Sequence, residues 1–194
     1  MSKLLNRSFY SRDSSIVAKE LLGKLIVRHF NNNILIGKIV ETESYLPEND
    51  PASHSFIGKT TRNSVLFNDA GFCYVFSIHR YFCFNTVCNS VNIPGGVLIR
   101  ALEPVQGIDL MENLRDNYSV KNLTNGPGKL CKALNITREQ NNIDLTKKES
   151  EIYILDAPKI SEELIVTTTR IGISKAAELP LRFYIKGNPF VSKF

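Results

Sequence analysis

Residues 34–46 read Ile34-Leu35-Ile36-Gly37-Lys38-Ile39-Val40-Glu41-Thr42-Glu43-Ser44-Tyr45-Leu46, an apolar run that ends in two carboxylates and a tyrosine. The run from Ile34 to Val40 predicts a buried strand, because it is short and rich in β-branched residues. Glu43 and Tyr45 share one parity, so both can project from the same edge of a sheet. Strand ends that lead into loops often carry functional side chains, and we expect a site here. The alternative is a solvated strand end before a turn.

The size and charge of the chain suit one domain with a polyanionic partner. Its 194 residues are enough to bury a core without disulfides or metals, so residues 1–194 are expected to form a single domain. The apolar content of 43% is ordinary for a globular protein. An excess of 24 Lys and Arg over 19 Asp and Glu gives a net charge of +5, with a pI near 9.0. This balance favours a nucleic acid as partner, which salt-dependent affinity would test.

The cysteines and histidines do not indicate a metal site. The four cysteines lack C-x-x-C spacing and the three histidines are scattered, so we expect reduced, buried thiols and neither zinc nor another cofactor. No stretch has the roughly 18–20 apolar residues of a membrane span, and residues 1–8 lack the apolar core of a signal peptide. We therefore expect a cytoplasmic protein that does not contact a membrane.

The rest of the chain predicts many short strands and few helices. Asp13 or Ser14 can cap a helix that runs to Leu22. Residues 31–33 are all Asn, which tolerates positive φ, so a hairpin is expected there. Strands are predicted at 25–30, 34–42, 74–78, 82–91, 97–102, 152–155, 164–168 and 181–185, helices at 105–114 and 129–134, and loops at 46–61 and 116–124. This pattern is typical of an α+β domain with a largely antiparallel sheet.

Several segments, in order along nearly the whole chain, resemble the alkyladenine (3-methyladenine) DNA glycosylase family. They are Phe9-Tyr10, residues 16–23, Val40-Glu41-Thr42-Glu43, Pro51-Ala52-Ser53-His54, Arg62-Asn63, Tyr74-Val75-Phe76, Phe82-Cys83-Phe84-Asn85, residues 97–104, Asn125-Gly126-Pro127-Gly128-Lys129-Leu130-Cys131, Arg170-Ile171-Gly172-Ile173 and residues 180–184. The resemblance implies a curved sheet with surrounding short helices. It also implies a monofunctional enzyme that flips alkylated purines out of double-stranded DNA and hydrolyses the N-glycosidic bond. 3-Methyladenine is the expected substrate, with hypoxanthine and 7-methylguanine as further candidates.

By resemblance, Glu43 is the general base that activates a water against the sugar. Arg100 would help to position that water, together with a backbone carbonyl near Ile171. Three other carboxylates are rivals for the role of base, and only the family register separates them from Glu43: Glu41, Glu48 and Asp50.

Arg100 also has a purely structural interpretation. An arginine at a strand end can form an ion pair, here with Glu103 or Glu43, without any catalytic role. No residue of the sequence can be named as the acid that protonates the leaving base.

The resemblance also implies a base pocket. Tyr45 and Phe76 would sandwich the flipped base, while His54 would meet it with a ring edge and a backbone carbonyl. Phe76 replaces a tyrosine expected at this family position, which keeps the stacking and loses a hydroxyl; alternatively, Phe76 is a core aromatic. Asn85 would clash with an amino group at purine C2 and so disfavour guanine, or else its amide serves a turn.

Contacts with the DNA backbone are expected from Arg62, with Thr60 and Asn63 nearby, and from Lys129 after a Gly-Pro-Gly turn. The alternative for each charged side chain is simple solvation. At the turn after Phe76, where the family has a Tyr-Gly-Met sequence that inserts a tyrosine into the duplex, this chain is one residue shorter. His79 is then the candidate wedge by position and Tyr81 by chemistry.

Two other functions remain open on the sequence. The altered turn motivates a protein that binds lesions, or an RNA-binding module, with little or no excision activity. A small-molecule hydrolase with a Glu and Arg pocket would lack DNA affinity. We expect a monomer, and no lysine is placed for the Schiff base that a lyase step needs.

Overall fold

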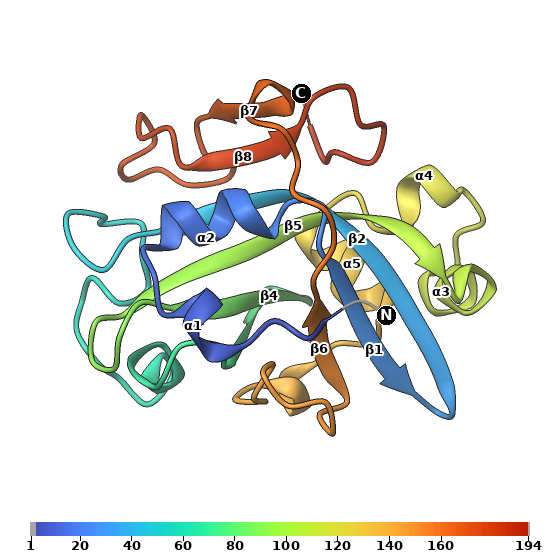
Figure 1. The fold of residues 1–194 in the computed structure, drawn as a ribbon, viewed down its shortest axis with the longest axis horizontal. Coiled ribbons are helices and arrows are strands. Elements are labelled where there is room, and N and C mark those ends of the chain that lie inside the picture. Colours follow the sequence, from blue (N-terminus) through green and yellow to red (C-terminus); the bar gives the residue numbers. More distant parts are fainter. Residues whose placement is uncertain (1–2, 194) are drawn as a thin grey trace.

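The computed structural model describes residues 3–193, which fold around one curled sheet (Figure 1). Its strands are β1 (Leu25–Phe30), β2 (Asn33–Tyr45), β3 (Cys73–Ile78), β4 (Tyr81–Cys88), β5 (Gly95–Gln106), β6 (Ile152–Leu155), β7 (Ile165–Thr168) and β8 (Arg182–Ile185). The order is β3-β4-β5-β2-β1-β6, with β8 paired to β2 and β7 to β8, and every pairing is antiparallel. The predicted α+β fold with an antiparallel sheet is confirmed.

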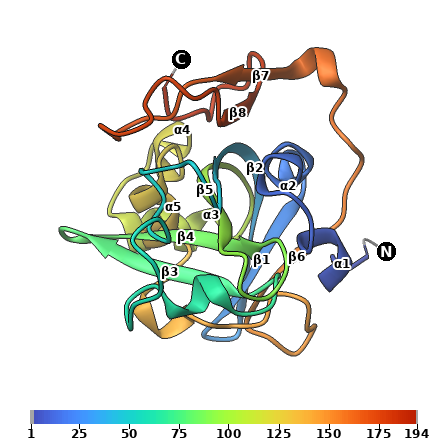
Figure 2. The ribbon, with the colours of Figure 1, turned by 90° about the vertical axis from the view of Figure 1, so that its left-hand side faces the viewer.

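The long strand β2 organises this sheet. One edge of β2 pairs with β5, while the other edge pairs first with β1 and then, at residues 41–43, with β8. The register between β2 and β5 shifts around residues 39–42, and such irregularities bend a strand. The β7–β8 hairpin consequently stands apart from β3 and β4, as Figure 2 shows. The bend places the end of β2 between β5 and β8.

The helices are α1 (Arg7–Tyr10), α2 (Ser14–Leu21), α3 (Ile108–Arg115), α4 (Val120–Leu123) and α5 (Pro127–Ala133), with 3-10 turns at Ser64–Phe67, Arg138–Gln140 and Glu162–Leu164. As expected, Asp13 caps α2, because its side chain accepts hydrogen bonds from the amides of Ser15 and Ile16. α2 packs against β2 and β5, and α5 packs against β4 and β5. Among residues 3–193, no helix is long and apolar enough to cross a membrane.

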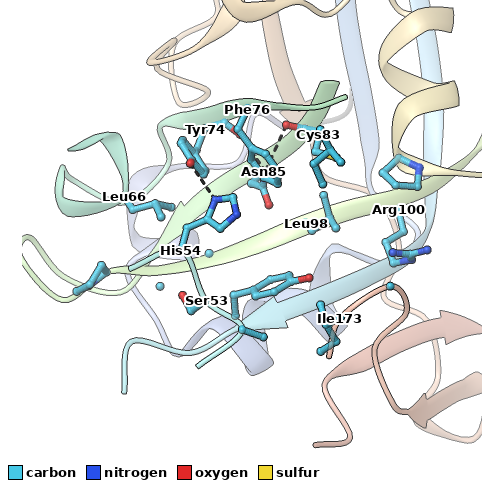
Figure 3. A pocket seen from close by; sticks show the side chains of 18 of the residues that line it. Ser53, His54, Leu66, Tyr74, Phe76, Cys83, Asn85, Leu98, Arg100 and Ile173 are labelled. Atoms are coloured by element: carbon cyan, nitrogen blue, oxygen red, sulfur yellow. Dashed lines mark hydrogen bonds between the residues drawn. The ribbon is translucent and has the colours of Figure 1, made fainter. Parts of the chain in front are cut away.

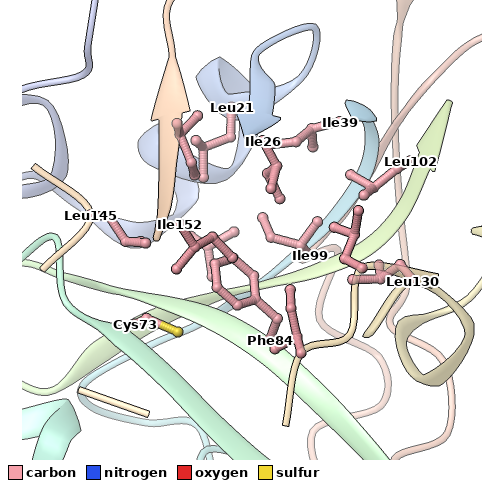
Figure 4. Close-up of a cluster of buried hydrophobic side chains, with 14 of the residues drawn as sticks. Leu21, Ile26, Ile39, Cys73, Phe84, Ile99, Leu102, Leu130, Leu145 and Ile152 are labelled. Atoms are coloured by element: carbon pink, nitrogen blue, oxygen red, sulfur yellow. The ribbon is translucent and has the colours of Figure 1, made fainter. Parts of the chain in front are cut away.

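Strand alternation separates the core from the site. Val75, Phe84 and Ile99 belong to the main hydrophobic core. Figure 4 shows Phe84 and Ile99 in this core together with Ile39 and Leu102. Full burial of each such side chain contributes about 1.5–3 kcal/mol. Their neighbours of opposite parity face the other side of the sheet, where the candidate site lies.

Several predicted boundaries were wrong. β2 runs on to Tyr45, so Glu43 and Tyr45 lie within the strand, and α4 lies in the segment expected to be a loop. The helix expected from Val105 begins only at Ile108, because pairing with β2 extends β5 to Gln106. Gly107 ends the strand at a φ of +78°, a conformation that glycine adopts readily. The hairpin at residues 31–33 is confirmed, with Asn31 and Asn32 at positive φ.

Candidate active site

A cavity of about 420 Å³ opens on the face of the sheet opposite the main core (Figure 3). Strand alternation supplies much of its lining: Tyr45 of β2, Tyr74, Phe76 and Ile78 of β3, Cys83 and Asn85 of β4, and Leu98 and Arg100 of β5. The loops contribute His54 and residues 171–173. The structure therefore gathers the expected base-pocket residues, Tyr45, His54, Phe76, Asn85 and Ile171, around one cavity.

Glu43 lies immediately behind this lining. Its Oε1 accepts a hydrogen bond from the Ile171 amide at 2.8 Å and pairs with Nη1 of Arg100 at 3.3 Å. Its Oε2 accepts from the Tyr45 hydroxyl at 3.1 Å. The Glu43 side chain is fully buried, while all three partners line the cavity. Tyr45, Arg100 and Ile171 thus separate the carboxylate from the cavity and also hold it in place.

The surroundings of Glu43 raise the pKa of its carboxyl above the ordinary value. Burial is the largest cause, and the negative charge of Glu41 adds to it. Arg100, the Ile171 amide and the Tyr45 hydroxyl act in the opposite direction without cancelling the effect of burial. A carboxylate with a raised pKa is a stronger base near neutral pH.

The rival carboxylates occupy different environments. Glu41 is buried beneath Arg100 and Arg182, at 3.0 and 2.7 Å from their Nε atoms. Glu48 is exposed in the loop after β2, and it does not line the cavity. Arg100 pairs with Glu41 and Glu43, whereas Glu103 pairs with Lys38, so the ion pair considered between Arg100 and Glu103 is absent.

Asp50 has a clear structural role. Its carboxylate forms a two-point ion pair with Arg170, at 2.6 and 2.7 Å, and both side chains are completely buried. The Arg170 guanidinium in turn lies 4.6 Å from the centre of the Tyr45 ring. This pair ties the loop after β2 to the segment that carries Ile171. The sequence indicated Asp50 only as a rival base and gave no sign of this contact.

The aromatic wall is built from side chains that contact one another. The His54 ring meets Phe76 edge to face, with centroids 4.4 Å apart, and its Nδ1 lies 3.0 Å from the Tyr74 hydroxyl (Figure 3). Burial, followed by the charge of Arg62, lowers the pKa of His54, which favours the neutral ring. Phe76 is only partly buried and lines the cavity, so it is not simply a core aromatic.

The side-chain amides of Asn85 and Asn63 donate hydrogen bonds to backbone carbonyls. Asn85 donates from Nδ2 to the carbonyls of Tyr74 and Cys83, at 3.0 and 3.4 Å, which leaves its oxygen for a bound molecule. Asn63 is buried and donates to the carbonyl of His54 at 2.8 Å. The sequence placed Asn63 at the DNA surface, but its side chain holds the loop that carries His54.

The other residues expected to contact DNA line two further hollows that share residues with the cavity. The amide of Thr60 donates to Asn63 Oδ1, and the exposed Arg62 donates to the carbonyl of Ser77 at 3.2 Å. A second cavity beside the first is lined by Ile78, His79, Tyr81 and Lys129, among others. Ile78 lines both cavities. Its parity placed it on the same strand face as Phe76, but the sequence did not mark it as a site residue.

The turn between β3 and β4 presents both wedge candidates. His79 is exposed at the turn with a φ of +52°, and Tyr81 is 57% exposed. Tyr81 packs closely on Gly128, where an added Cβ would lie 2.8 Å from the tyrosine Cβ. Across residues 3–193, no three His, Cys, Asp or Glu side chains form a group that would hold a metal ion.

An aromatic cavity backed by a buried Glu and Arg pair can hold a planar base beside a carboxylate that is able to activate water. Sequence comparison gives the family: the chain belongs to the methylpurine-DNA glycosylases, whose family model matches residues 8–189. The resemblance read from the sequence is confirmed.

Similar proteins come from several bacteria. The chain is 49% identical over 191 residues to a protein of Carboxydothermus hydrogenoformans, covering 98% of this chain and 99% of the relative. It is 51% identical over 178 residues to one from Francisella tularensis, covering 91% and 92%. A Clostridium perfringens protein is 47% identical over 203 residues, covering 97% and 98%. All three bear the name "Putative 3-methyladenine DNA glycosylase".

The chain is accordingly an enzyme of the DNA-3-methyladenine glycosylase type, a hydrolase of N-glycosyl bonds. Its family acts in DNA repair, and its substrate is DNA.

Proposed function

We propose that this protein flips 3-methyladenine out of double-stranded DNA and hydrolyses the bond between that base and its deoxyribose. A base within a duplex is inaccessible, and extrusion costs a few kcal/mol. Stacking between Tyr45 and Phe76, which line the same cavity, offsets about 1–3 kcal/mol per base. Damaged bases that pair weakly are extruded at lower cost, which favours lesions over normal bases.

Glu43 acts as the general base for the attacking water. The single observation that carries this proposal is the set of three contacts from cavity-lining groups to its carboxylate. Oε1 accepts from the Ile171 amide and pairs with Arg100, while Oε2 accepts from the Tyr45 hydroxyl and has a second lone pair that can accept from a water. Since Glu43 is fully buried, that water must enter between Tyr45, Arg100 and Ile171.

In the reaction, the water oxygen bonds to the anomeric carbon and its proton goes to Glu43. The bond to the base breaks, and the base leaves with the electron pair. An alkylated purine that already carries a positive charge becomes neutral as it leaves, so the reaction needs no protein acid. Arg100 orients the carboxylate and the water.

The cavity and its surroundings set the substrate range. Asn85 at the cavity wall disfavours a purine with an amino group at C2, so normal guanine is refused. Hypoxanthine lacks this group and is a further substrate to test; 7-methylguanine carries it and should be the poorer substrate of the two. Arg62 and Lys129 contact phosphates, and the turn at residues 78–81 enters the duplex.

The test is release of 3-methyladenine from alkylated duplex DNA by the wild-type protein and Glu43→Gln under single-turnover conditions. Loss of a general base should lower the rate by roughly 10²–10⁴-fold. Glu103→Gln is a matched control, since Glu103 is a partly exposed glutamate that pairs with Lys38. Equal rates for wild type and Glu43→Gln would eliminate Glu43 as the base. The DNA strand should stay intact until alkali is added, because no lyase step is proposed.

The second candidate is a lesion-binding protein without efficient excision. It is motivated by the short turn at His79, which differs from the family sequence. Tight, salt-dependent binding to a duplex with an abasic-site analogue, with no base released from any alkylated substrate, would favour it. Preference for RNA would indicate an RNA-binding module, and lack of affinity for nucleic acid a small-molecule hydrolase.

A further inference from the structure

A second buried carboxylate, Glu41, lies two residues before Glu43 on the same face of β2. It is completely buried and does not line the cavity. Its Oε1 accepts hydrogen bonds from Nε of Arg100 at 3.0 Å and Nε of Arg182 at 2.7 Å. Burial of a charged carboxylate costs free energy even when it is paired, so the presence of Glu41 at this position calls for an explanation.

Arg100 is shared between the two carboxylates. Its Nε binds Glu41, while its Nη1 lies 3.3 Å from Glu43. A guanidinium is planar and rigid, so a bond at Nε fixes the direction of both terminal nitrogens. Glu41 therefore determines where Arg100 meets Glu43, although Glu41 itself has no contact with the cavity.

Residues from the far end of the chain hold Glu41 in turn. The amide of Ser192 donates to Oε2 at 2.7 Å, and its hydroxyl donates to Oε1 at 2.9 Å. The same hydroxyl accepts from Nη2 of Arg100 at 3.4 Å. Arg182 also donates to the carbonyl of Lys193. The segment at residues 192–193 is thus bonded to Glu41, Arg100 and Arg182.

We propose that Glu41 is a positioning residue for base excision, which fixes Arg100 against Glu43, and that Ser192 holds Glu41 in the orientation this requires. The inference rests on the proposed role of Glu43. It assigns a function in catalysis to a segment about 150 residues away in sequence, which the sequence motifs did not single out.

A pH profile can separate positioning from support of the fold. The groups that act on Glu43 are Glu41 and Tyr45 from β2, Arg100 from β5, and the amide of Ile171. Cys83 of β4 and Arg170 also lie within electrostatic reach of Glu43. The charge of Glu41 raises the pKa of Glu43, whereas that of Arg100 lowers it. Loss of the Glu41 charge alone would lower the pKa of Glu43, but displacement of Arg100 removes a larger effect in the opposite direction, so the pKa of Glu43 should rise.

The first experiment measures single-turnover release of 3-methyladenine by Glu41→Gln across pH. We expect the plateau rate to fall roughly 10 to 100-fold and the acid limb to move to higher pH, because Arg100 is misplaced in this variant. Glu103→Gln should match the wild type in both respects. A reduced plateau with an unmoved acid limb would reduce Glu41 to a structural role, and an unchanged profile would overturn the inference entirely.

A second experiment tests the inference without depending on correct folding of the Glu41 variant. Ser192→Ala should lower the plateau rate roughly tenfold, while Ser192→Thr, which keeps the hydroxyl, should restore most of it. Ser161→Ala is the control, because Ser161 is exposed and its side chain does not cap the turn that follows. Equal loss in the Ala and Thr variants, or no loss in either, would contradict the role of Ser192. If the wild type itself releases no base, the proposed function fails. If the wild type releases base and the Glu41 and Ser192 variants release it at the same rate, the inference fails while the proposed function stands.

Discussion

The hydroxyl of Tyr45 donates a hydrogen bond to Oε2 of Glu43 over 3.1 Å, so one side chain forms a wall of the cavity and also contacts the buried carboxylate. Burial and the nearby charge of Glu43 raise the pKa of Tyr45, which keeps the hydroxyl protonated and able to donate. The proposed recognition of a base and the proposed activation of water would therefore be coupled through this residue.

Tyr45→Phe removes the hydrogen bond and keeps the ring. We expect roughly a tenfold lower rate of base release, consistent with loss of a hydrogen bond to a charged group. Because this bond lowers the pKa of Glu43, the acid limb of the pH profile should move to higher pH. Tyr153→Phe is the control, since that hydroxyl contacts His29 instead. An acid limb that stays in place would show that the hydroxyl does not act on the base.

The wild-type enzyme should have a pH profile set by Glu43. Only the ionised carboxylate accepts a proton from water, so the single-turnover rate should rise as pH increases through the pKa of Glu43. Burial raises that pKa, and the midpoint should lie above that of an ordinary glutamate. The limb should vanish in Glu43→Gln; its persistence there would assign it to another group.

The Asp50 and Arg170 pair should be essential for stability. Asp50→Asn leaves the Arg170 charge buried and uncompensated, which we expect to lower the free energy of unfolding by about 3–5 kcal/mol in urea denaturation. Glu20→Gln, which breaks a pair with Arg12 nearer the surface, should cost less than about 1 kcal/mol. Similar losses from both variants would argue against a special role for the buried pair.

The turn between β3 and β4 should control the affinity for flipped-out substrates. We expect Tyr81→Ala to weaken binding to a duplex with an abasic-site analogue about tenfold, because Tyr81 is 57% exposed, lines the same cavity as Lys129 and can stack on a base. His79→Ala should have a smaller effect, and Tyr118→Ala, which removes an exposed ring outside both cavities, none. A larger loss from His79→Ala would identify the histidine as the wedge.

Residue alternation made much of the site predictable. The sequence placed Tyr74, Phe76 and Ile78 on one face of a strand, and all three line the cavity. The hairpin at Asn31 followed equally from local backbone preferences. The end of β5 could not be predicted from local preferences. Pairing with β2 keeps residues 103–106 in the sheet, although their sequence favours a helix.

The sequence by itself determined the class of fold, the family and the set of candidate side chains, because parity, turn residues and ordered motifs are local properties. The family resemblance singled out Glu43 among the four acidic residues near the end of β2, and only the tertiary structure showed what each of the four contacts. Glu43 contacts the lining of the cavity, Glu41 binds two arginines and Ser192, Asp50 binds Arg170, and Glu48 is exposed. The function of a carboxylate depends on its burial and on partners distant in sequence, which no local pattern encodes.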